Sequence, residues 1–61
     1  MTYSEKVKNA RERLLLTQDE MAIELGVNAI TVWRWETGKS EPNKKAKKGI
    51  RDFCIKKGLN F

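Results

Sequence analysis

Helix-boundary signals divide the middle of this chain into two short helical segments. The run Thr17-Gln18-Asp19-Glu20 has the pattern of a capping box, in which the threonine hydroxyl and the glutamate carboxylate each accept a hydrogen bond from the other residue's backbone amide. Gly26 ends that segment, because glycine enters the left-handed region at no steric cost. Asn28 is a favourable cap for the next segment, which Gly38 closes. The sequence therefore predicts one helix on each side of a short connection.

Two further helices flank this pair, and no strand pattern is present. A second capping box, over residues 2–5, opens the first helix, and Asn43 is the predicted cap of the last. The apolar positions of these two helices recur with helical period: Tyr3, Val7, Ala10 and Leu14, then Ala46, Ile50, Phe53 and Cys54. We expect one all-α domain over residues 1–61, a compact bundle of four helices or, with a short addition, five.

The composition excludes several classes of protein. A chain of 61 residues has room for one core, because a domain of this size buries only about 60% of its unfolded surface. Histidine is absent and Cys54 is the one cysteine, which leaves no imidazole triad, internal disulfide or zinc site. No apolar run exceeds three residues, so we expect no membrane-spanning segment or signal peptide. These features predict a cytoplasmic binding domain that is no enzyme and needs no metal or cofactor.

Charge is distributed unevenly along the chain. Residues 1–38 hold five basic and six acidic groups, whereas residues 39–61 hold eight basic groups against two acidic ones. This asymmetry indicates an anionic partner that the C-terminal third approaches. A solvated lysine face that keeps a small protein soluble explains the same charge count equally well.

The two central helices have the elements of a helix-turn-helix, with the motif over about residues 17–37. Ala22 is small where the helices would cross, and Gly26 supplies the turn. Val32 and Trp35 fall on the arc of the second helix that faces the core.

These residues resemble the lambdoid phage repressor and Xre-type helix-turn-helix family. The resembling stretch runs from Leu16 to Ala22, continues through Leu25-Gly26-Val27 and closes with Trp35-Glu36-Thr37-Gly38-Lys39. The resemblance implies a lambda-repressor-like fold and a prokaryotic or phage transcription regulator, with repression as the expected direction. It also implies a homodimer on double-stranded DNA, and we expect no small-molecule ligand.

The resemblance places the helix over residues 28–37 in the DNA major groove, with its N-terminal part at the base edges. Arg34 has the clearest chemistry, because a guanidinium can donate two hydrogen bonds to guanine O6 and N7. For Trp33, stacking on the sugar–phosphate backbone competes with filling a gap beside the first helix or contacting another protein. The expected base-contacting residues are Asn28, Ala29, Ile30, Trp33 and Arg34.

Phosphate contacts are expected at the start of the helix that opens the motif, where free amides favour an anion, and around the loop that follows the motif. Lysines crowd the first turns of the last helix, where they oppose the helix dipole, so local stability does not explain them. The expected phosphate-contacting residues are Gln18, Thr31, Lys39, Ser40, Asn43, Lys44 and Lys45.

Two structural expectations also follow from the resemblance. Arg11 and Glu36 look like the internal ion pair of the family, to which we assign a structural role. Leu15 stands where the family often has the glycine that ends the first helix. Since a leucine at positive φ costs on the order of 1 kcal/mol, we expect this turn to be built differently.

Two functions remain open at this stage. The first is a sequence-specific DNA-binding transcription regulator, whose affinity would come from phosphate contacts and whose selectivity would come from the helix over 28–37. The second is a protein-binding module of the same fold, an antitoxin or anti-repressor, which would use Trp33 and a surface around Ile23 and Ile30.

Overall fold

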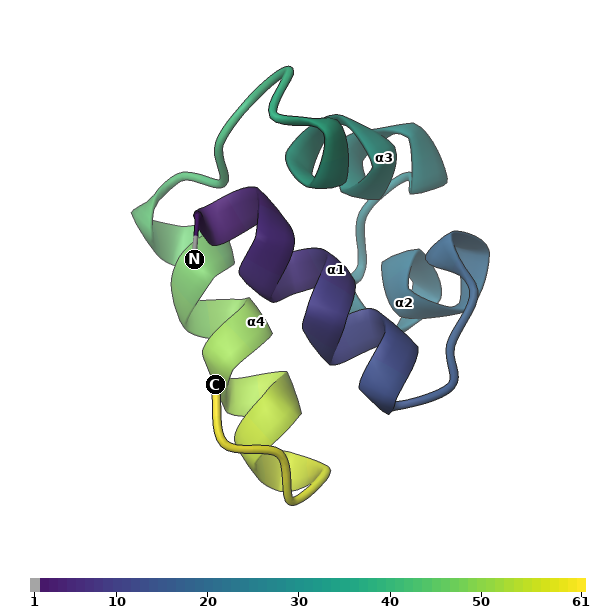
Figure 1. Ribbon diagram of the computed structural model, residues 1–61, viewed down its shortest axis with the longest axis vertical. Coiled ribbons are helices and arrows are strands. Elements are labelled where there is room, and N and C mark those ends of the chain that lie inside the picture. Colours follow the sequence, from purple (N-terminus) through teal and green to yellow (C-terminus); the bar gives the residue numbers. More distant parts are fainter. Residues whose placement is uncertain (1) are drawn as a thin grey trace.

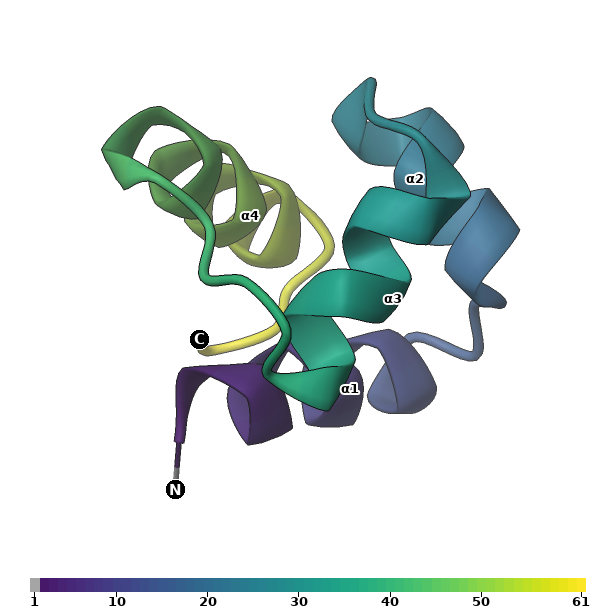
Figure 2. The same ribbon diagram turned by 90° about the horizontal axis from the view of Figure 1, so that it is seen from above.

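The computed structural model describes residues 2–61, which fold into four helices and no strand. The helices are α1 (Tyr3–Arg13), α2 (Gln18–Leu25), α3 (Ala29–Thr37) and α4 (Lys44–Lys56). α3 packs against both α1 and α2, while α4 packs against α2 and lies alongside α1 (Figures 1 and 2). The predicted all-α bundle is confirmed with four helices, and the described chain after α4 continues without a fifth. None of the four helices combines the length and the apolar character needed to cross a membrane, within the part described.

The helix ends lie where the sequence predicts them. In the box that opens α2, the Thr17 amide donates to the Glu20 carboxylate at 2.8 Å, and the Glu20 amide donates to the Thr17 hydroxyl at 3.1 Å. The box that opens α1 forms in the same way between Thr2 and Glu5. The hydrogen bonds from Thr2 lower the pKa of Glu5, because they favour its ionised form.

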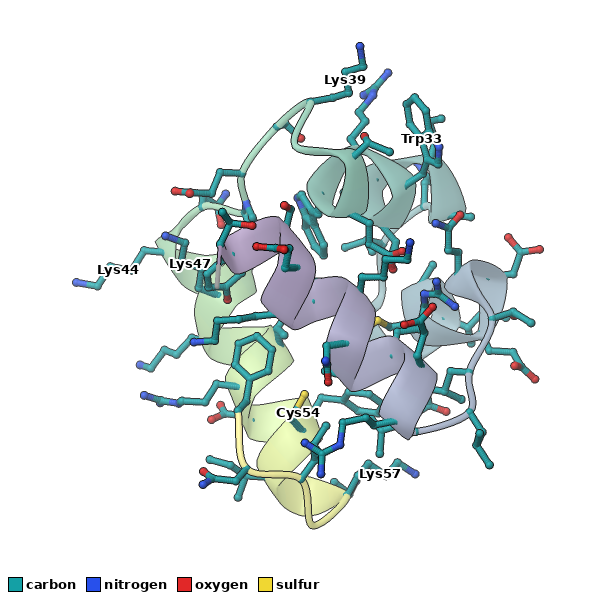
Figure 3. All side chains as sticks on the ribbon, in the orientation of Figure 1. Trp33, Lys39, Lys44, Lys47, Cys54 and Lys57 are labelled. Carbon is teal, nitrogen blue, oxygen red and sulfur yellow. The ribbon has the colours of Figure 1, made fainter. Side chains whose placement is uncertain are left out.

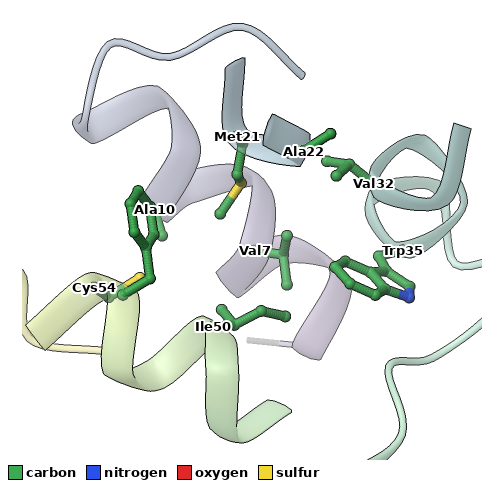
Figure 4. Close-up of a cluster of buried hydrophobic side chains, with 9 residues drawn as sticks. Val7, Ala10, Met21, Ala22, Val32, Trp35, Ile50 and Cys54 are labelled. Carbon is green, nitrogen blue, oxygen red and sulfur yellow. The ribbon is translucent and has the colours of Figure 1, made fainter. Parts of the chain in front are cut away.

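The core is one cluster to which all four helices contribute (Figure 4). Its buried members are Val7, Ala10, Met21, Ala22, Val32, Trp35, Ile50, Phe53 and Cys54. The apolar periodicity of α1 and α4 therefore predicted the buried faces of both helices. Burial raises the pKa of the Cys54 thiol, which keeps it protonated and unreactive.

The turn between α1 and α2 contradicts one expectation. Leu15 adopts the left-handed conformation, with φ +58°, although it is not glycine. The Leu15 amide donates to the Glu12 carbonyl at 3.0 Å and the Leu16 amide to the Arg11 carbonyl at 3.1 Å, which together make a Schellman motif. The turn is thus the one that a glycine would make, and these hydrogen bonds hold the leucine in a strained backbone conformation.

Replacing Leu15 by glycine is expected to raise the free energy of unfolding by about 0.5–1 kcal/mol, because it removes the Cβ strain. The Leu15 side chain is 89% exposed, so its loss removes little packing. Urea denaturation followed by far-UV circular dichroism measures the change. Leu15→Ala is the matched control, since alanine loses the same exposed side chain but keeps the Cβ atom. A Leu15→Ala variant as stable as Leu15→Gly would contradict the strain account.

Candidate nucleic-acid interface

The connection between α2 and α3 sets the direction of α3. Gly26 lies in the left-handed region at φ +71°, and the Val27 amide donates back to the Ala22 carbonyl at 3.0 Å. Ala22 and Val32 are both buried, and Trp35 turns inward with them. Because these residues fix one side of α3 to the core, the other side faces away from the molecule.

The exposed side of α3 carries a mixed apolar and cationic surface, formed by Ile30, Trp33 and Arg34, which we call the α3 outer face. Ile30 is 50% exposed and Trp33 is 40% exposed. Figure 3 shows Trp33 and Lys39 projecting from the same end of the molecule, away from α1 and α4. Trp33 is not a member of the core cluster.

Arg34 is free to bind a partner. No ion pair or side-chain hydrogen bond holds its guanidinium within residues 2–61. Its backbone carbonyl accepts hydrogen bonds from the amides of Lys39, at 2.9 Å, and Ser40, at 3.3 Å. The end of α3 is therefore fixed while the Arg34 side chain is left without a partner of its own.

Asn28 and Ala29, the other two predicted base-contacting residues, differ in their exposure to solvent. Asn28 is exposed at the N-cap of α3, and its side chain makes no capping hydrogen bond. Its amide and carbonyl groups therefore face solvent at the position where α3 begins. Ala29 is half-buried and packs against the core, which leaves it the smallest accessible surface of the five residues.

A buried carboxylate connects α1, α2 and α3. Glu36, whose side chain is 3% exposed, accepts hydrogen bonds from Arg11 Nε at 2.6 Å and Arg11 Nη2 at 3.1 Å. Arg11 Nη1 donates to the Leu16 carbonyl at 2.9 Å, which ties the α1–α2 turn to the same group. The hydrogen bond to Glu36 raises the pKa of Arg11, because it favours the charged guanidinium. The predicted ion pair is confirmed.

The same carboxylate also holds Gln18, a contact that the sequence did not predict. Gln18 Nε2 donates to Glu36 Oε1 at 3.1 Å. Gln18 is the first residue of α2, so this bond orients its carboxamide at the helix start, where the first backbone amides have no partner within the helix. In the sequence, the helical spacing of residues 28–37 already places Glu36 toward the inner side of the helix. This spacing does not show which side chain of α2 hydrogen-bonds to Glu36.

The remaining predicted phosphate-contacting residues lie directly after α3, at the start of α4 and in the first turn of α3. Lys39 and Ser40 are exposed directly after α3, while Lys44 and Lys45 are exposed at the start of α4. Asn43 caps α4, because its Oδ1 accepts a hydrogen bond from the Ala46 amide at 2.8 Å, and its NH₂ group is left to donate. Thr31 is half-buried in the first turn of α3.

Two short helices joined by a left-handed turn, the second with an outward face free of internal partners, define a helix-turn-helix domain. The sequence is similar to the HTH-type transcriptional activator BcrR of Enterococcus faecalis, with 36% identity over 53 residues. The aligned region spans 87% of this chain and 26% of that protein, so the similarity concerns about a quarter of the relative's length. No family model and no solved structure matches the chain. The relative supports the helix-turn-helix class but not the narrower resemblance to lambdoid repressors and Xre-type proteins.

Arg11→Met is expected to destabilise the fold strongly, because it leaves the buried Glu36 carboxylate without its counterion. Removing one partner of a buried ion pair costs about 3–5 kcal/mol. A domain of this length has a total stability of roughly 3–9 kcal/mol, so much of the population should unfold. Circular dichroism and urea denaturation measure the loss. Arg13→Met, on an exposed position of the same helix, is the control, and an equal loss in both variants would refute the special role of Arg11.

Proposed function

We propose that this chain is a sequence-specific, double-stranded DNA-binding domain of a transcription regulator. The observation that carries the proposal is the α3 outer face. It presents an unpaired guanidinium beside exposed apolar side chains on the second helix of a helix-turn-helix. The similarity to a relative named as a transcriptional activator supports the same class of function. The proposed role is binding and not catalysis.

In the proposed complex α3 enters the major groove, which is about 12 Å wide and admits a helix. Arg34 donates two hydrogen bonds to a guanine, and Ile30 contacts the methyl group of a thymine. Asn28 has free hydrogen-bonding groups for a base or phosphate at the helix start. Trp33, at the edge of the same face, packs against the sugar–phosphate backbone. Base selectivity therefore depends on the α3 outer face, with Arg34 as the residue that discriminates most strongly.

Phosphate contacts in this proposal come from both sides of α3. On one side, the first amides of α2 and the Gln18 carboxamide, which Glu36 holds in place, face one strand. On the other side, Lys39 and Ser40 contact the opposite strand, and Lys44 and Lys45 extend that contact along the backbone. Such contacts give affinity without selectivity.

We propose that the domain binds DNA as a dimer, and that a reporter assay will distinguish repression from activation. Helix-turn-helix regulators commonly bind as two-fold dimers on half-sites about 34 Å apart, and we propose this arrangement here, within a prokaryotic cytoplasm. The resemblance in sequence favours repression, while the relative is named an activator. The proposal is therefore for regulation through DNA binding, and a promoter–reporter assay determines its sign.

The alternative is a protein-binding module of the same fold. It is favoured by Ile23 on α2, which is 78% exposed, together with the exposed Ile30 on α3. A gel shift with random duplex DNA discriminates the two functions. The regulator retards duplex DNA at low salt, whereas the module leaves it free.

Arg34→Ala is expected to weaken binding to a site selected from a random oligonucleotide pool by about 1–3 kcal/mol and to relax the preference at one base pair. Fluorescence anisotropy on the selected duplex and on its single-base variants measures both effects. Lys57→Ala is a matched loss of one charge at the end of the molecule opposite to α3 (Figure 3) and should leave specificity unchanged. An unaltered base preference in Arg34→Ala would remove the assignment.

Binding should also weaken steeply as salt rises, because each phosphate contact releases condensed counterions. Lys39→Ala should lower the slope of log K against log salt by about one and weaken binding to selected and random duplexes alike. A titration series at increasing potassium chloride measures the slope. Affinity that stays flat across this range would rule out the phosphate-contact mechanism.

A further inference from the structure

A pocket of about 380 Å³ lies between the first turn of α1, the first two turns of α4 and Phe61. Two aromatic rings, those of Tyr3 and Phe61, form part of its wall. The other lining side chains are all cations: Lys6, Lys44, Lys47, Lys48 and Arg51. We call these seven residues the basic pocket, and no acidic side chain is among them.

The aromatic rings hold two of the lysines in place. Tyr3 and Phe61 pack edge to face, with ring centroids 5.8 Å apart. Lys6 Nζ lies 4.8 Å from the Phe61 centroid, and Lys47 Nζ lies 4.9 Å from the Tyr3 centroid. A cation–π contact positions an ammonium group but does not neutralise it, so the pocket keeps its positive charge.

Carboxylates near the pocket balance only part of this charge. Glu41 accepts from Lys47 at 3.1 Å and Asp52 lies 3.6 Å from Arg51, and both carboxylates are exposed to water. Lys6, Lys44 and Lys48 form no ion pair in the described chain.

The lysines of α4 also occupy its first turns, where cations oppose the helix dipole. Their mutual repulsion therefore lowers stability, and the Glu41–Lys47 ion pair compensates for only part of it. A bound anion would offset this repulsion, because it attracts each of the lysines.

The basic pocket is separate from the α3 outer face. In Figure 3, Lys44 and Lys47 lie on the flank formed by α1 and α4, whereas Trp33 and Lys39 lie at the end of α3. Lys44 alone belongs both to the pocket and to the expected phosphate contacts on DNA. The pocket volume falls within the range of small-ligand sites, about 300–1,000 Å³.

From these observations we infer that the basic pocket binds a small anion with two linked phosphate groups, of the diphosphate class. Lysine binds phosphate as a compact charge with three donors, and the pocket offers four lysines and one arginine around one depression. Burial raises the pKa of Tyr3, so its phenol stays protonated and can donate a hydrogen bond to a phosphate oxygen. The sequence alone predicted no small-molecule ligand, because the two rings of the pocket come from opposite ends of the chain.

The test is a titration of the DNA-free protein with inorganic pyrophosphate at low salt, followed by the NMR signals of the Tyr3 and Phe61 rings. We expect ring shifts that saturate at one pyrophosphate per chain and a rise in the thermal midpoint as the anion is added. Lys48→Gln and Arg51→Gln should each weaken binding at least about tenfold, since each removes a charged donor. Lys57→Gln, a matched loss of charge outside the pocket, should bind as the wild type does.

Three outcomes would overturn the inference. The first is a set of shifts spread over all lysines without saturation, and the second is equal weakening by Arg51→Gln and Lys57→Gln. The third is that pyrophosphate fails to bind. In that case a second measurement compares duplexes, and Arg51→Gln could weaken binding to a duplex with long flanks but not to one with short flanks. That result would assign the pocket to phosphates of the DNA backbone. Because the pyrophosphate titration contains no DNA, its failure would leave the proposed regulator function untouched.

Discussion

The arrangement of this domain depends on the hydrogen bonds that the buried carboxylate of Glu36 accepts. This carboxylate accepts hydrogen bonds from Arg11 on α1 and from Gln18 at the start of α2, while itself belonging to the end of α3. One charged group thus joins three helices, and Arg11 adds the α1–α2 turn through the Leu16 carbonyl. Apolar packing alone would allow these short helices to slide, whereas a buried ion pair has a strict geometry and fails if any partner moves.

The hydrogen bonds of Glu36 matter because they fix the orientation of the proposed binding surface on the opposite side of α3. Glu36 lies on the inner side of α3, with Val32 and Trp35, so the α3 outer face has one orientation relative to α1 and α2. The Gln18 carboxamide is set by the same group, which places the start of α2 at a fixed distance from α3. In the proposed complex, a surface prepared in this way loses little conformational freedom on binding. The basic pocket, formed by residues of α1 and α4 together with Phe61, contains neither Glu36 nor the side chains that bind Glu36.

Local patterns predicted the helices and most of the core, because capping boxes, helix-ending glycines and apolar periodicity act within a few residues. The prediction for the Leu15 turn was wrong because it considered only the backbone strain of that one residue. Two hydrogen bonds of the turn, and the bond from Arg11 to the Leu16 carbonyl, offset this strain in the folded structure. The Gln18–Glu36 bond and the pairing of Tyr3 with Phe61 join residues far apart in the chain, and no local pattern reports such distances. The base and phosphate contacts stay predictions, since they concern a partner and not the fold.

In the proposed function, the α3 outer face contacts base edges in the major groove. Methylation interference on a bound duplex tests it most directly, because methylation of guanine N7 blocks the major-groove edge and methylation of adenine N3 blocks the minor groove. Binding should be lost when a guanine within each half-site carries a methyl group at N7. Interference from adenine N3 alone, or none at any base, would contradict it.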